Sequence, residues 1–144
     1  MSSQNILITG VSGQDGVFLT SSLNESKNSN QTIIGVTRQN PKQTFDRLKS
    51  IDTKSSNLKL INIDLTSANE TLKLISETKP THIYNLSGPS SVYDSINKDL
   101  YFLNTINSIF DNLTNACVQE NIFPNFFQAC SSEMFSSSNS MPLN

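Results

Sequence analysis

Tryptophan is absent from these 144 residues, and the sequence holds only two cysteines and one histidine. Cys117 and Cys130 have neither the spacing of metal ligands nor the number needed for a disulfide framework, so we expect both to be reduced, half-buried packing residues. His82 has no second imidazole or carboxylate close to it in sequence, which favours a structural role at the start of a strand. The composition therefore predicts neither a metal site nor a disulfide-stabilised fold.

Charge is also sparse, since 10 Lys and Arg against 12 Asp and Glu give a formal net charge of −2. Without an excess of positive charge to follow a phosphate backbone, the composition argues against nucleic acid as a partner. No apolar run approaches the roughly 20 residues of a membrane-spanning helix, which argues against a membrane partner. Residues 1–5 lead directly into an apolar segment without the pattern of a secretory signal, so we expect a cytoplasmic protein.

Short apolar runs recur along the chain, separated by segments of helical length. They predict five strands, at residues 5–9, 32–36, 58–63, 82–86 and 125–129. The first four are apolar at nearly consecutive positions, which is typical of a parallel sheet covered on both faces. Apolar periodicity and end signals predict helices over residues 14–24, 45–51, 68–77 and 100–120, the third with a capped start.

The longest predicted helix, 100–120, carries a regular apolar stripe that should face the core. The stripe comprises Leu103, Ile106, Phe110, Leu113 and Cys117.

Alternating strands and helices predict an α/β fold, a Rossmann-type doubly wound parallel sheet of about five strands in the order 3-2-1-4-5. We assign residues 1–135 to one NAD(P)-binding domain and residues 136–144 to a polar, loosely held tail. The unpaired edge of the last strand, 125–129, favours self-association, so a homo-oligomer is expected.

A glycine-rich loop follows the first strand and opens the first helix. Its residues are Gly10, Val11, Ser12, Gly13, Gln14, Asp15 and Gly16. Gly10 suits the tight turn, Gly13 lets the main chain approach a diphosphate, and Gly16 permits close packing of helix on strand. The spacing in this strand-turn-helix context predicts a dinucleotide whose diphosphate binds at the helix N-terminus.

The end of the second strand reads Gly35-Val36-Thr37-Arg38 and has no acidic residue to bind the ribose hydroxyls of NAD. Arg38 is placed to pair with a 2′-phosphate, for which a guanidinium is well suited. We therefore favour NADP over NAD, while an arginine that merely points to solvent is the alternative interpretation.

Five segments together resemble the extended short-chain dehydrogenase/reductase superfamily and, within it, the GDP-mannose 4,6-dehydratase family. The segments are 8–16, with its Gly-Gln-Asp-Gly sequence, 35–38, 64–66, 83–92 and 128–135. The resemblance implies that Asp64 and Leu65 lie beside the adenine and that 86–88 pass beneath the ribose and nicotinamide side. With the glycine loop and Arg38, the full set of predicted cofactor residues is Gly10, Ser12, Gly13, Gln14, Asp15, Gly16, Arg38, Asp64, Leu65, Leu86, Ser87, Gly88, Ser90 and Tyr101. Simpler roles remain open, a turn cap for Asp64 and a core position for Tyr101.

The same resemblance implies a redox-neutral dehydration of a sugar nucleotide, in which the cofactor takes a hydride and later returns it. Ser131 matches the family's hydroxyl residue and Glu133 its base for the C5 proton. The three tyrosines, Tyr84, Tyr93 and Tyr101, are not followed four residues later by lysine, so the family's Tyr-x-x-x-Lys is missing from this sequence.

The sequence thus leaves more than one function open. The first is the cofactor-binding part of an NADP-dependent dehydratase acting on GDP-mannose, expected to be inactive as these 144 residues. The others are a non-catalytic NADP-binding module and a fragment of another sugar-nucleotide epimerase or reductase.

Overall fold

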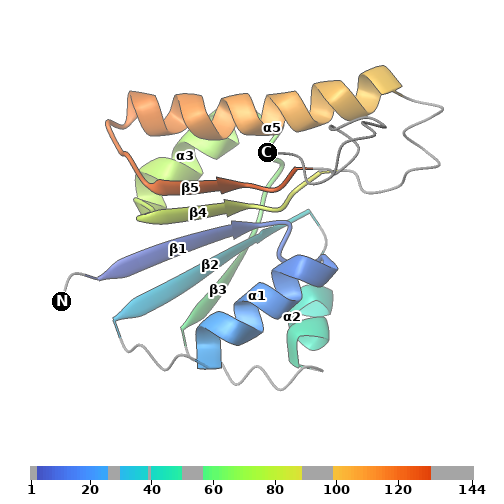
Figure 1. Cartoon of the computed structure of the whole chain (residues 1–144), viewed down its shortest axis with the longest axis vertical. Coiled ribbons are helices and arrows are strands. Elements are labelled where there is room, and N and C mark those ends of the chain that lie inside the picture. Colours follow the sequence, from blue (N-terminus) through green and yellow to red (C-terminus); the bar gives the residue numbers. More distant parts are fainter. Residues whose placement is uncertain (1–2, 26–29, 39, 50–56, 89–98, 131–144) are drawn as a thin grey trace, which may run out of the picture.

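A five-stranded parallel sheet lies between two layers of helices in the computed structural model, which describes residues 3–25, 30–38, 40–49, 57–88 and 99–130 (Figure 1). Its order is β3-β2-β1-β4-β5, which confirms the predicted Rossmann-type fold. The strands are β1 (Gln4–Thr9), β2 (Gln31–Thr37), β3 (Leu58–Asn62), β4 (His82–Asn85) and β5 (Asn125–Gln128). All four neighbouring pairs are parallel, with β3 and β5 at the ends of the order.

The two faces of the sheet are covered by different helices. Helices α1 (Gln14–Glu25) and α2 (Pro41–Lys49) lie on one face, and α3 (Ala68–Thr78) and α5 (Asp99–Gln119) on the other (Figure 1). In β1, Leu7 belongs to the core cluster beneath α3 and α5, whereas Ile6 and Ile8 belong to the cluster beneath α1 and α2. Burial on both faces explains why the strand is apolar at consecutive positions.

Helix α2 begins four residues before the position that we predicted from its apolar periodicity. It starts at Pro41, and the Asn40 side chain accepts a hydrogen bond from the Lys42 N–H at 2.9 Å. Asparagine at the N-cap followed by proline in the first helical position is a strong start signal that periodicity alone does not weigh. The predicted end at residues 50–51 lies outside the described residues.

Helix α3 has the capped start that its sequence predicts. The Ser67 side chain accepts a hydrogen bond from the Glu70 N–H, while the Glu70 carboxylate accepts from the Asp64 N–H at 3.0 Å. At the other end Lys79 adopts the left-handed conformation, with φ of 42°, and its N–H donates to the Ile75 carbonyl. Pro80 follows at once, so both ends are defined locally.

The prediction of the apolar stripe of α5 that faces the core is only half correct. Leu113 and Cys117 are buried, but Leu103 is 55% and Phe110 39% exposed. Instead, the buried row runs through Thr105, Ile109, Leu113, Ala116 and Cys117. Phe110 lies at the margin of this row. Its ring packs edge to face on that of Phe126 of β5, with the ring centroids 5.8 Å apart.

The cysteines and the histidine differ in how well they were predicted. Cys117 is buried, and burial raises the pKa of its thiol, but Cys130 is exposed, so its prediction as a half-buried packing residue is wrong. Cys130 is the second residue after β5. His82 hydrogen-bonds Thr81 through Nδ1 and Asn125 through Nε2, as a structural residue at the start of a strand does.

Candidate nucleotide-binding site

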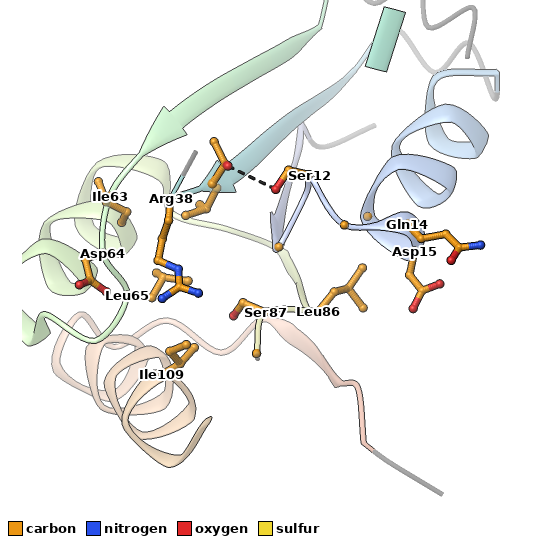
Figure 2. A pocket seen from close by; sticks show the side chains of 16 residues that line it. Ser12, Gln14, Asp15, Arg38, Ile63, Asp64, Leu65, Leu86, Ser87 and Ile109 are labelled. Atoms are coloured by element: carbon orange, nitrogen blue, oxygen red, sulfur yellow. Dashed lines mark hydrogen bonds between the residues drawn. The ribbon is translucent and has the colours of Figure 1, made fainter. Parts of the chain in front are cut away.

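A cavity of about 490 Å³ opens at the edge of the sheet where β1, β2, β3 and β4 end (Figure 2). Its walls are the glycine loop before α1, the ends of β2 and β3, the segment after β4, and Ile109 of α5. Ligands of open parallel sheets bind at this edge, at the point where the strand order reverses, which here lies between β1 and β4. The volume lies within the range of small-molecule and cofactor sites.

Two glycines fix the shape of the loop. Gly10 has a φ of +67°, and a Cβ placed on it would lie 2.7 Å from the Leu86 carbonyl oxygen. A Cβ on Gly16 would lie 2.5 Å from the Gly10 carbonyl oxygen. Larger residues at either position would therefore force the backbone apart.

Gly13 is different, because among the described residues a Cβ there would meet only the Gly10 carbonyl oxygen, at 3.2 Å. Otherwise it would enter open space, and Gly13 lines the cavity. The fold alone therefore gives little reason for glycine at this position. A group bound in the cavity would give a much stronger reason, because it would occupy the space of a side chain.

The start of α1 presents main-chain N–H groups to the cavity. The Gly13 N–H donates to the Gly10 carbonyl at 2.9 Å and closes the turn, and the Val17 N–H makes the first helical bond, to Gly13. The N–H groups of residues 14–16 thus have no carbonyl partner inside the helix, and the helix dipole adds positive potential. This arrangement suits a diphosphate. The side chains of Gln14 and Asp15 are exposed and point away from Arg38 (Figure 2).

At the other end of the cavity, Arg38 and Asp64 line it from the ends of β2 and β3 (Figure 2). The Asp64 carboxylate accepts hydrogen bonds from the Thr66 N–H at 3.0 Å and from its hydroxyl at 2.8 Å, so the proposed turn cap is present. These two bonds, with a smaller contribution from the charge of Arg38, lower the pKa of Asp64. Among the described residues, no carboxylate lies within 4.0 Å of the Arg38 guanidinium.

A second cavity of about 290 Å³ adjoins this end and shares Arg38 and Asp64 with the first. Tyr101 lines it together with Thr66 and three polar residues of α5. Tyr101 is 60% exposed, so the alternative of a core position on the long helix is wrong.

The structure brings nearly all the predicted cofactor residues together. Twelve of them line the main cavity, namely Gly10, Ser12, Gly13, Gln14, Asp15, Gly16, Arg38, Asp64, Leu65, Leu86, Ser87 and Gly88. Tyr101 lies in the adjoining cavity, while Ser90, Ser131 and Glu133 are outside the described residues. Their roles in binding or catalysis remain predictions.

Four residues that line the cavity were not predicted as site residues, namely Val36, Thr37, Ile63 and Ile109. Thr37 is buried and donates to the Ser12 hydroxyl at 3.4 Å, the dashed line in Figure 2. Ile109 reaches the cavity from α5 and is 4% exposed. Thr37 stands next to Arg38 at a strand end, which was an available signal, whereas Ile109 was missed because the stripe on α5 was placed one row aside.

A family profile described as GDP-mannose 4,6 dehydratase matches residues 7–144. The chain belongs to the GDP-mannose 4,6-dehydratase family. The human GDP-mannose 4,6 dehydratase is 35% identical over 91 residues, which cover 60% of this chain and 24% of the human protein. GDP-mannose 4,6 dehydratase 1 of Arabidopsis thaliana is 31% identical over 140 residues, covering 91% of this chain and 38% of the plant protein. This family member therefore spans well under half the length of these relatives.

Solved structures show the same fold. A UDP-glucose-4-epimerase from Stenotrophomonas maltophila with bound NAD and formylated UDP-arabinopyranose superimposes with a TM-score of 0.80 at 16% identity, covering 97% of this chain and 40% of that one. A UDP-glucose 4-epimerase from Bifidobacterium longum in complex with NAD⁺ and UDP gives 0.79 at 16% identity, covering 97% and 41%. None of the described helices is long and apolar enough to cross a bilayer. The described residues also hold no cluster of His, Cys, Asp and Glu suited to a metal ion.

Proposed function

We propose that this chain binds NADP in the main cavity and is the cofactor-binding part of a dehydratase that converts GDP-mannose to GDP-4-keto-6-deoxymannose. The observation that carries the proposal is the glycine loop, which places the N-terminus of α1 against a cavity bounded by Arg38 at its far end. Family membership supplies the substrate class, and the arrangement of the loop supplies the cofactor class.

Each part of the cavity has a role in this proposal. The N–H groups at the start of α1 hold the diphosphate, and Arg38 pairs with the 2′-phosphate of the adenosine. Asp64 and Leu65 lie beside the adenine, and the segment 86–88 lies beneath the other nucleoside. When bound, the cofactor supplies the capacity to accept a hydride and return it, while the chain binds and orients it.

The two epimerase structures described above hold NAD and therefore do not support NADP. The proposed preference for NADP rests on Arg38. No acidic residue stands at the end of β2 to bind the ribose hydroxyls of NAD. Ser131 and Glu133 are proposed for the catalytic steps that the family carries out. Because these 144 residues contain no Tyr-x-x-x-Lys, we expect them to bind cofactor without dehydrating GDP-mannose.

The proposal is tested by titrating the chain with NADPH and with NADH and following the fluorescence of the reduced nicotinamide. Saturable binding with tighter affinity for NADPH is expected, and no binding of either ligand would overturn the proposal. A product assay for the 4-keto-6-deoxy sugar nucleotide, run on a longer chain carrying Tyr-x-x-x-Lys, separates the dehydratase from an epimerase, a reductase or a non-catalytic module.

A further inference from the structure

A chain of polar side chains crosses three strands directly beneath the cavity, with the carboxamide of Asn85 at its centre. The Asn85 Oδ1 accepts hydrogen bonds from the Thr9 hydroxyl of β1 and, at 2.8 Å, from the Ser87 hydroxyl. The Asn85 Nδ2 donates to the Gln128 Oε1 of β5 at 2.7 Å. Asn85 is 1% exposed and Thr9 is fully buried, so the network is closed to solvent at its centre.

These contacts hold the carboxamide of Asn85 in one orientation. Its oxygen accepts from two hydroxyls and its nitrogen donates to the Gln128 Oε1, so turning the group over would set two amide oxygens against each other. In a buried position such a mismatch is costly because no water is available to satisfy the groups. The Ser87 N–H also donates to the Thr9 hydroxyl oxygen, at 3.2 Å. Ser87 is thus fixed through both its main chain and its side chain.

The position of Ser87 links this network to ligand binding. Ser87 lines the main cavity, whereas Thr9, Asn85 and Gln128 do not. With Arg38 and Asp64 at the ends of β2 and β3, and the glycine loop after β1, a dinucleotide lying along this edge places its second nucleoside over β4. Ser87, the second residue after β4, therefore lies beneath the half that carries the nicotinamide.

We propose that Asn85 is a positioning residue for the nicotinamide half of the dinucleotide. It holds Ser87 at the floor of the cavity directly and through Thr9, while Gln128 anchors the Asn85 carboxamide to β5. This inference rests on the proposed function, because it requires a dinucleotide in the cavity. A purely structural role would affect both halves of the ligand, whereas loss of the Asn85 carboxamide should selectively weaken binding of the nicotinamide half.

The test measures the affinities of NADPH and of adenosine 2′,5′-bisphosphate, which lacks the nicotinamide half, by calorimetry. Asn85→Leu should weaken NADPH binding about tenfold and leave the affinity for the bisphosphate within about twofold of wild type. Gln128→Leu removes the tie from Asn85 to β5 and the Gln128 Nε2 hydrogen bond to the Ala129 carbonyl. It should weaken NADPH binding in the same way and carries the test if Asn85→Leu does not fold. Ile83→Val is the matched control, since it alters a fully buried residue of the same strand without touching the network.

Equal weakening of both ligands in Asn85→Leu or Gln128→Leu, or no weakening of NADPH, would overturn the inference while leaving the proposed function standing. Failure of the proposed function would appear differently, as a wild-type chain that binds neither NADPH nor the bisphosphate.

Discussion

Arg38 is the side chain on which the choice between the two dinucleotides depends. It lies at the end of β2, lines both cavities, and has no described carboxylate within ion-pair distance. The nearby Asp64 is engaged by the Thr66 N–H and hydroxyl. A guanidinium in this position is available for the bidentate hydrogen bonding that a phosphate offers.

Replacing Arg38 with glutamine should therefore weaken NADPH by about 10- to 100-fold, the loss expected for hydrogen bonds to a charged group. NADH, which has no 2′-phosphate, should be affected little. Parallel fluorescence titrations measure both affinities, and Lys73→Gln on the exposed side of α3 is the charge-matched control. Equal losses for NADPH and NADH would show that Arg38 does not contact the 2′-phosphate.

Asp64 gives a prediction about stability and pH. Its pKa is lowered in the folded chain, chiefly by the Thr66 main-chain hydrogen bond, so the carboxylate stabilises the fold above its unfolded pKa. This contribution should disappear as the pH falls through the folded pKa. Asp64→Asn should have a lower urea midpoint than wild type at neutral pH and the same midpoint in acid below the ordinary aspartate range. A difference that does not change with pH would contradict this account.

The helices differ in how far their sequences define them. Helix α3 was predicted closely because its start and end depend on Ser67 and Pro80, both local signals. In α5 the apolar residues occupy two adjacent rows, so helical spacing alone does not decide which row faces the sheet. Packing against α3 decides it, and this contact joins segments far apart in the sequence.

Removal of the α3 cap gives a prediction at this scale. Ser67→Ala deletes the acceptor for the Glu70 N–H and should destabilise the chain by about 1 kcal/mol. The expected fall in the thermal midpoint, followed by circular dichroism, is about 4 °C. Ser76→Ala, within the same helix, is the control and should lower the midpoint little. An unchanged midpoint in Ser67→Ala would mean that the Glu70 carboxylate and the packing of α3 suffice to hold the helix start.

For the molecule as a whole, the strand order and most of the cavity could be predicted, because alternating apolar segments and a glycine loop are local patterns. The network around Asn85 could not. Thr9, Asn85 and Gln128 come from three strands, and the sequence separation is 76 from Thr9 to Asn85 and 43 from Asn85 to Gln128. A polar residue at a strand end looks the same in sequence whether it faces water or a buried partner.

The central claim is that the loop and the start of α1 bind the diphosphate of a dinucleotide, and Gly13 tests it most directly. Among the described residues, a Cβ at Gly13 comes close only to the Gly10 carbonyl oxygen, at 3.2 Å, so Gly13→Val should keep the far-ultraviolet circular dichroism spectrum of wild type. It should occupy the space next to the N–H groups of α1 and weaken NADPH at least about tenfold in the fluorescence titration. A folded Gly13→Val chain that binds NADPH as tightly as wild type would contradict the account.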